Sequence, residues 1–164
     1  PEGREEITTE GGLNVKANEK KLQNFVYKLK EAGIIISMFV DADIEQINAA
    51  YSVGAEVCEI HTGPYSNSFY LHGRDQYSKD VQSELKKIAI AGEEINKLGM
   101  RFNAGHALNY FNVQPVCSLN GIRELHIGHA IISRSVFVGI REAVREMKRL
   151  MREACKWLLE LGQI

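Results

Sequence analysis

Two glycine–histidine pairs are the residues whose types and positions first suggest chemistry. Gly105-His106 follows the strand-like run MRFNA, and Gly128-His129 follows the run ELHI. A histidine side chain titrates near neutral pH, so it can give or take a proton as a reaction requires. If both runs are parallel strands, both histidines lie at carboxyl ends of strands, where barrel enzymes carry their active sites.

A carboxylate, Glu59, is the third candidate. In EVCEIH, Glu59 and His61 are two positions apart, so they project from one face of a strand, while Cys58 and Ile60 project from the other. An interior carboxylate either forms a structural ion pair or serves a reaction. Together with the two histidines it favours an acid–base site on one rim.

Gly128 has a second possible role, because it precedes His129 at the entrance to the segment AIISRSVFVGIREAV, where a helix can start. The free backbone N–H groups at a helix start bind phosphate, as they do after the last strands of eight-stranded barrels. The alternative is a tight strand-to-helix turn that binds no ligand.

Four repeats of helix, glycine, apolar strand and polar loop must position these residues. The predicted strands are 34–40, 55–61, 100–105 and 122–128. The predicted helices are 19–32, 44–53, 79–98 and about 134–161. This is the pattern of right-handed βαβ units around a parallel sheet. Asp43 is predicted to cap a helix, Asp41 is either a polar strand end or functional, and the polar stretch 62–78 is predicted to be a mobile lid.

The chain length leaves two α/β architectures open. Eight βα units usually need about 250 residues, whereas this chain has 164. It is therefore either an open sheet or the C-terminal portion of an eight-stranded barrel, and the start at Pro1 without a methionine favours the second. We expect one domain over residues 1–164, preceded in its gene by about 80 to 100 further residues, because the barrel needs that length.

The overall composition excludes several classes of protein. With 20 basic and 21 acidic residues the formal charge is −1, so neither nucleic acid nor an anionic membrane is an expected partner. The sequence has no transmembrane run and no signal peptide, which predicts a cytoplasmic protein. Cys58, Cys117 and Cys155 are odd in number and lack metal-ligand spacing. They favour reduced thiols over a disulfide framework.

Five motifs occur in an order that resembles the pyridoxine 5′-phosphate synthase family: EITTEGGLNV, SMFVDADIEQI, EIHTG, NAGHALNYFNV and HIGHAIISRSVFVGIREAVREMKRLM. The resemblance implies a (β/α)8 TIM barrel of which this chain supplies about the last four to five βα units, without strands 1–3 and most of strand 4. It implies the condensation of 1-deoxy-D-xylulose 5-phosphate with 3-amino-2-oxopropyl phosphate. The products are pyridoxine 5′-phosphate, phosphate and water, formed without a metal or other cofactor.

The resemblance also implies roles for individual residues. Thr8 corresponds to a contact with the deoxyxylulose phosphate, Glu59 to a carboxylate that stabilises charge during ring closure, and His106 to a proton donor. The implied contacts with the aminoketone phosphate are Ala107, Gly128 and His129.

Two positions depart from the family pattern. Ala107 stands where glycine is expected, and it would be strained if its φ were positive. His126 stands where asparagine is expected. We expect neither departure to touch a proposed proton carrier.

Two other functions and one assembly state are compatible with the sequence. A metal-dependent hydrolase could use His61, His106 and His129 with a carboxylate as ligands. A non-catalytic half-barrel could act as a binding module. The apolar end of the last helix predicts a homo-oligomer through Trp157, Leu158 and Leu159.

Overall fold

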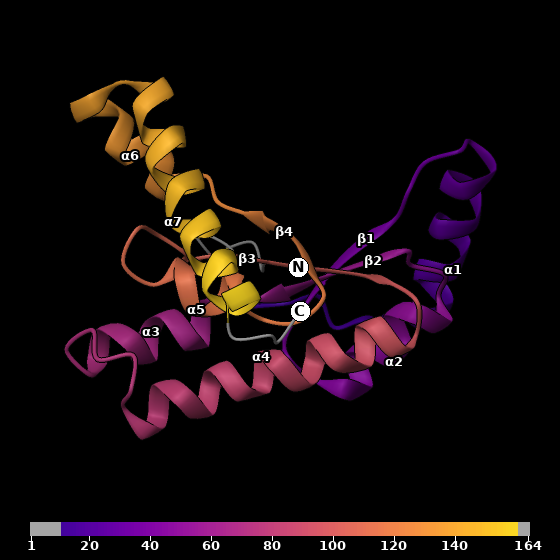
Figure 1. Ribbon diagram of the computed structural model, residues 1–164. Coiled ribbons are helices and arrows are strands. Elements are labelled where there is room, and N and C mark those ends of the chain that lie inside the picture. The colour runs from indigo at the N-terminus through magenta and orange to yellow at the C-terminus, as the bar shows by residue number, and fades with distance from the viewer. Residues whose placement is uncertain (1–10, 161–164) are drawn as a thin grey trace.

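Parallel strands form one sheet whose spatial order follows the chain order (Figure 1). The computed structural model describes residues 11–160. Within this range the sheet has four strands, β1 (Ser37–Val40), β2 (Val57–His61), β3 (Arg101–Gly105) and β4 (Ile122–His126). All neighbouring strands are parallel. The predicted strands are confirmed, although three of them begin one to three residues later than predicted and β4 ends two residues earlier.

Helices precede, connect and follow the strands. They are α1 (Val15–Glu31), α2 (Ile44–Ser52), α3 (Gly63–Leu71), α4 (Lys79–Lys97), α5 (Val113–Cys117), α6 (His129–Val138) and α7 (Ile140–Glu160). The side chain of Asp43 accepts a hydrogen bond from the backbone N–H of Glu45, which confirms the predicted cap of α2. Asn14 caps α1 in the same way, so this helix begins four residues earlier than predicted.

The prediction of a loop over 62–78 is wrong for its first half, which forms α3. Pro64 lies in the first turn of this helix, a position where the missing N–H of proline is tolerated. Tyr65 and Phe69, four residues apart, are both buried. The Gly, Pro, Ser and Asn content of this stretch indicates a turn, but the burial of two aromatic side chains on one helical face outweighs that preference.

The prediction of one long terminal helix is also wrong. Gly139 has a φ of 80°, which ends α6, and α7 begins at the next residue. α6 itself begins at His129, five residues earlier than predicted, so the second Gly-His pair lies directly at a helix start. None of the helices within the described residues is both long and apolar enough to cross a membrane.

The two faces of the sheet differ in chemistry. One face, with α2 and α4 packed against it, carries the buried apolar residues Met38, Val40, Cys58, Ile60, Phe102 and Ala104. Alternation along the strands puts polar residues on the opposite face. These include Glu59, His61, Asn103 and His126, which lie on three adjacent strands. The predicted division of β2 into an apolar and a polar face is confirmed.

Candidate active site

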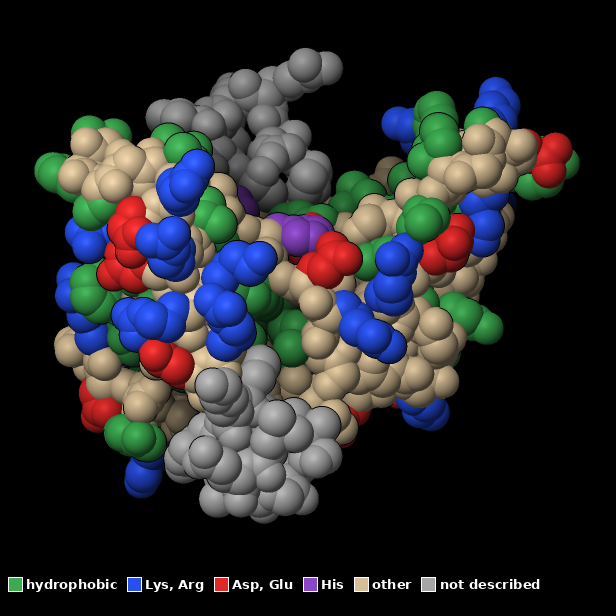
Figure 2. Space-filling view, turned by 45° about the horizontal axis from the view of Figure 1, so that its top comes forward, with side chains coloured by type: hydrophobic (Ala, Val, Ile, Leu, Met, Phe, Trp, Pro, Cys, Tyr) green, Lys and Arg blue, Asp and Glu red, His purple; other side chains and the backbone are tan. Residues whose placement is uncertain are grey.

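A cavity of about 710 Å³ lies at the polar face, beyond the carboxyl ends of β3 and β4. Its lining residues are Glu59, His106, Ala107, Leu108, Asn109, His126, Ile127, Gly128, His129 and Ala130. Figure 2 shows histidine and acidic side chains next to one another on the floor of a hollow between two raised parts of the surface. The structure therefore brings five of the predicted site residues, contributed by three βα units, to one cavity.

The turn that carries the first Gly-His pair has an unusual backbone. His106 has a φ of 80° and Ala107 a φ of 59°, both in the left-handed region. The hydroxyl of Thr62 lies 2.7 Å from the carbonyl oxygen of Gly105 and 2.5 Å from that of His106. The hydroxyl of Ser66 donates to the carbonyl of Ala107 at 2.6 Å. Hydrogen bonds from the start of α3 thus hold the turn, and Ala107 is strained as its positive φ implies.

The His106 ring is held by aromatic neighbours on two other strands. Its centroid lies 5.2 Å from that of His61 and 5.9 Å from that of Phe39. His61 is buried, and its Nδ1 lies 2.9 Å from Oδ1 of Asp41. Asp41 also accepts the backbone N–H of Gly12 at 2.9 Å. Asp41 is therefore more than a polar strand end, because it fixes His61, against which His106 packs.

Glu59 has a partner that the sequence analysis did not anticipate. Its Oε2 lies 2.6 Å from Nδ1 of His126, the histidine that replaces the expected asparagine. The expectation that this departure touches no proposed proton carrier is therefore wrong, because Glu59 is one of the acid–base candidates. Asn103 was also missed. Its Nδ2 lies 3.4 Å from Nε2 of His126, and the alternation of RFNAG, which places Asn103 on the same face as Gly105, is the signal that could have found it.

The second Gly-His pair opens α6 in a much more accessible setting. Gly128 is the N-cap residue, with a φ of −108°, and no side chain caps this helix start. Within the described residues, α6 has no buried member. Nε2 of His129 lies 3.5 Å from the hydroxyl of Ser133 in the next turn. The first residues of α6, Gly128 to Ala130, thus line the cavity, and free N–H groups at a helix start can bind an anion.

Burial raises the pKa of two side chains beside the site, Cys58 and Tyr65. It raises the pKa of Cys58 to about 12, with a further contribution from the charge of neighbouring Glu59. It also raises the pKa of Tyr65 to about 12, and the Tyr65 hydroxyl donates to the carbonyl of Asn112 at 3.0 Å. Cys58 therefore remains a neutral thiol near neutral pH and is not a nucleophile.

Some sequence-based predictions fall where the structure gives no information. Thr8 lies outside the described residues, as do the side chains of Cys155, Trp157, Leu158 and Leu159. In the described part of the chain, no three His, Cys, Asp or Glu side chains are grouped closely enough to hold a metal ion.

Comparison with known proteins assigns the chain to a family. The family described as pyridoxal phosphate biosynthesis protein PdxJ matches residues 1–153. Pyridoxine 5′-phosphate synthase of Dechloromonas aromatica is 64% identical over 156 residues, which are 95% of this chain and 62% of that protein. The synthase of Azoarcus sp. is 63% identical over 154 residues, which are 94% of this chain and 62% of that protein.

A solved structure shares the fold at low sequence identity. In the crystal structure of the Amycolatopsis orientalis BexX/CysO complex, the matching chain has a TM-score of 0.57 and 14% identity. The match covers 88% of this chain and 52% of that one. The chain thus spans about three fifths of the length of the curated relatives it matches. The motif order, the cavity and the sequence identity agree, and the chain belongs to the PdxJ family of pyridoxal phosphate biosynthesis proteins.

Proposed function

We propose that this chain forms part of the active site of a pyridoxine 5′-phosphate synthase. The reaction condenses 1-deoxy-D-xylulose 5-phosphate with 3-amino-2-oxopropyl phosphate and releases one phosphate and water. The observation that carries the proposal is the convergence of Glu59, His106, Ala107, Gly128 and His129 on one cavity. Family membership and identity above 60% to named synthases support the same activity.

The proposed mechanism needs groups that move protons and a site that holds phosphate. His106, fixed against His61, donates a proton to the departing oxygen during dehydration. Glu59 stabilises positive charge that develops on the condensing nitrogen. The N–H groups at the start of α6, with Gly128 and His129, bind the phosphate of the aminoketone. Each step is an acid–base or electrostatic step that these side chains can supply, so the proposal includes no cofactor.

The proposed architecture is a (β/α)8 barrel in which residues 1–164 supply the C-terminal portion. Strand order that follows chain order, with α2 and α4 on one face, is typical of a barrel wall, whereas a doubly wound sheet reverses direction at a switch point. Within the described residues, β1 and β4 each have one unpaired edge. Additional strands pairing with both edges would close the barrel and enclose the polar face.

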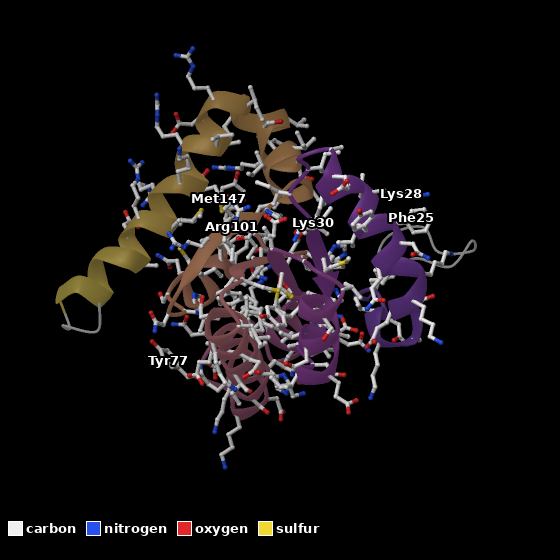
Figure 3. All side chains as sticks on the ribbon, turned by 90° about the vertical axis from the view of Figure 1, so that its right-hand side faces the viewer. Phe25, Lys28, Lys30, Tyr77, Arg101 and Met147 are labelled. Carbon is white, nitrogen blue, oxygen red and sulfur yellow. The ribbon has the colours of Figure 1, made fainter. Side chains whose placement is uncertain are left out.

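Exposed apolar side chains beside these edges support closure by further βα units. Next to β1, Phe25 is 55% exposed and lies on the outer side of α1, and Ile35 is 57% exposed (Figure 3). Beyond β4, Ile132 and Val136 of α6 are also exposed. Further helices packed against these residues would remove them from water. Reading the coding sequence upstream of Pro1 tests this architecture, and a native start codon adjacent to Pro1 would contradict it.

The activity is tested with the complete protein and both phosphorylated substrates. We expect pyridoxine 5′-phosphate, detected by chromatography and absorbance, with one inorganic phosphate released for each product molecule. In the His106→Asn variant, the rates at which pyridoxine 5′-phosphate and inorganic phosphate form should fall by the same factor. Wild-type protein that binds the substrates but forms no product would contradict the synthase and favour the binding module.

A metal-dependent hydrolase is less well supported, because its ligands are not grouped. His61 is paired with Asp41, and His129 lies at the start of α6, which follows β4 at the opposite edge of the sheet from β1. Turnover unchanged by dialysis against a chelator is the outcome we expect for the synthase.

We also propose a homo-oligomer, for which an aromatic surface gives support. Tyr70, Leu71 and Phe111 are exposed, and the guanidinium of Arg74 lies over the rings of Tyr70 and Phe111. A second copy of the chain that covered this surface would bury apolar area. Light scattering of the complete protein and of a Leu71→Asp variant measures the effect, and a monomeric wild type would contradict the proposal.

A further inference from the structure

Glu59 reaches His126 by crossing the strand that lies between them. Glu59 on β2 pairs with Asn103 on β3, and His126 on β4 pairs with Gly105, two residues further along β3. A Cβ added at Gly105 would collide with Oε1 of Glu59 and lie 3.0 Å from Cβ of His126. Because Gly105 has no side chain, the Glu59 carboxylate can reach the His126 ring across β3.

The Glu59–His126 pair forms part of the cavity wall, so its geometry shapes the site. Both residues line the cavity wall, and the Glu59 side chain is 17% exposed, against 42% for His126. Among the described side chains, His126 is the ionic partner that Glu59 contacts. The mostly buried carboxylate therefore depends on one ring nitrogen for its orientation.

Polar side chains on three strands lie next to the His126 ring. They are Glu59 on β2, Asn103 on β3 and, on β4, Glu124, whose Oε2 lies 3.5 Å from Nε2 of His126. A neutral ring with its proton on Nδ1 donates to Glu59 and accepts from the Asn103 amide. A protonated ring donates to Glu59 from Nδ1 and to Glu124 from Nε2. In both forms the donor to Glu59 is present.

We propose that His126 is a positioning residue that holds the Glu59 carboxylate in its reactive orientation. This inference depends on the proposed synthase function and extends it to a residue outside the family pattern. It also explains how histidine can replace asparagine there. The amide nitrogen of asparagine is the same number of bonds from the backbone as Nδ1 of histidine, so either side chain can donate to Glu59 from the same point.

Three substitutions at position 126 of the complete protein separate positioning from packing. His126→Ala removes the donor, His126→Asn keeps a donor at the Nδ1 position, and His126→Gln moves it to the Nε2 position. Losing one hydrogen bond to a charged group lowers kcat roughly tenfold, which we expect for the alanine and glutamine variants with KM within about twofold. The asparagine variant should recover most of the wild-type kcat. Glu124→Gln, which alters the other side of the same ring, is the control and should change kcat by less than about twofold.

The results that would overturn the proposal are equally specific. Equal kcat in the alanine, glutamine and asparagine variants would show that no donor at the Nδ1 position is needed. A loss confined to KM and thermal stability would show that His126 only supports packing.

A stability measurement tests the pair without relying on activity. Free energies of unfolding are measured for the wild type, His126→Gln, Glu59→Gln and the double variant. We expect the double variant to lose less stability than the sum of the two single variants, and additivity would overturn the proposal. If the wild type has no synthase activity, the proposed function fails, and this cycle alone then decides whether His126 holds Glu59.

Discussion

The two Gly-His pairs have the same local sequence and opposite surroundings. Gly105 and His106 follow a strand whose last four residues are buried, and hydrogen bonds from Thr62 hold the turn after it. Gly128 and His129 follow an exposed strand and open a helix with no buried residue among those described. Within the described residues, the first pair is therefore fixed by tertiary packing, whereas the second has few contacts.

This difference corresponds to two different chemical tasks. A proton donor must be held at a fixed position relative to the reacting atom, and the rings of Phe39 and His61 restrict His106 in this way. A phosphate site needs accessible N–H groups, which a crowded turn could not offer. Similar motifs therefore have different proposed roles because their neighbours differ.

The largest expected effect is a loss of turnover when His106, in the first Gly-His pair, is replaced. His106→Asn should lower kcat by roughly 100-fold or more, the usual scale for losing a general acid. Asparagine tolerates the positive φ of this position, so the thermal midpoint should change little. Steady-state kinetics and thermal unfolding of the complete protein measure both quantities. Wild-type turnover with a much lower thermal midpoint would mean that His106 is structural.

The same glycine-to-valine substitution should affect stability very differently in the two pairs. Gly105→Val forces the Glu59 carboxylate and His126 to move, so the free energy of unfolding should fall by roughly 1 to 3 kcal/mol. Among the described residues, Gly128 has no atom within 4 Å of an added Cβ, and its φ is negative. Its valine variant should therefore lose less than about 1 kcal/mol, the scale of a poorer N-cap residue. Denaturant unfolding compares the two, and equal losses would contradict the contrast.

Phosphate affinity, unlike stability, should be sensitive to valine in the second Gly-His pair. Valine at position 128 blocks close approach of phosphate to the helix-start N–H groups, so affinity for inorganic phosphate should fall roughly tenfold, as for the loss of one charged hydrogen bond. His129→Ala should weaken binding less, because it removes one contact and leaves the backbone site. Isothermal titration of phosphate into the three proteins measures this effect. Equal affinities would show that the second pair is only a turn.

The smallest expected effect is relief of strain at Ala107. Its φ of 59° costs an alanine about 1 to 2 kcal/mol, part of which the greater chain entropy of glycine offsets. Ala107→Gly should therefore raise the free energy of unfolding by up to about 1 kcal/mol. Ala89→Gly, inside α4, is the matched control and should lower it by about 1 kcal/mol. A loss of stability in both variants would show that the turn is not strained.

Local patterns in the sequence predict most of the elements. Continuous apolar runs predict the strands, and Asp43 predicts the start of α2. Gly33, Gly54 and Gly99, the glycines between a helix and the next strand, have positive φ values of 74°, 94° and 76°. These features depend on neighbours within about one helical turn, which the sequence displays directly.

Other features depend on contacts between distant parts of the chain. α3 has turn-forming residues in its sequence and is helical because Tyr65 and Phe69 are buried. Thr62 looks like a loop residue in the sequence, yet it holds the turn at His106, 44 positions away. Propensity alone is too weak to predict such cases, because tertiary burial outweighs it.

The sequence by itself determined the strands, the polar face of β2 and the two Gly-His pairs, because alternation and turn residues are local properties of the chain. Only the tertiary structure decided that Glu59 meets His126, because their contact depends on the register of three strands and on the space above Gly105. It also decided that one histidine is packed and the other exposed. Burial is a property of what surrounds a residue in space, and the residues that contact His106 come from β1, from β2 and from Thr62, the N-cap of α3.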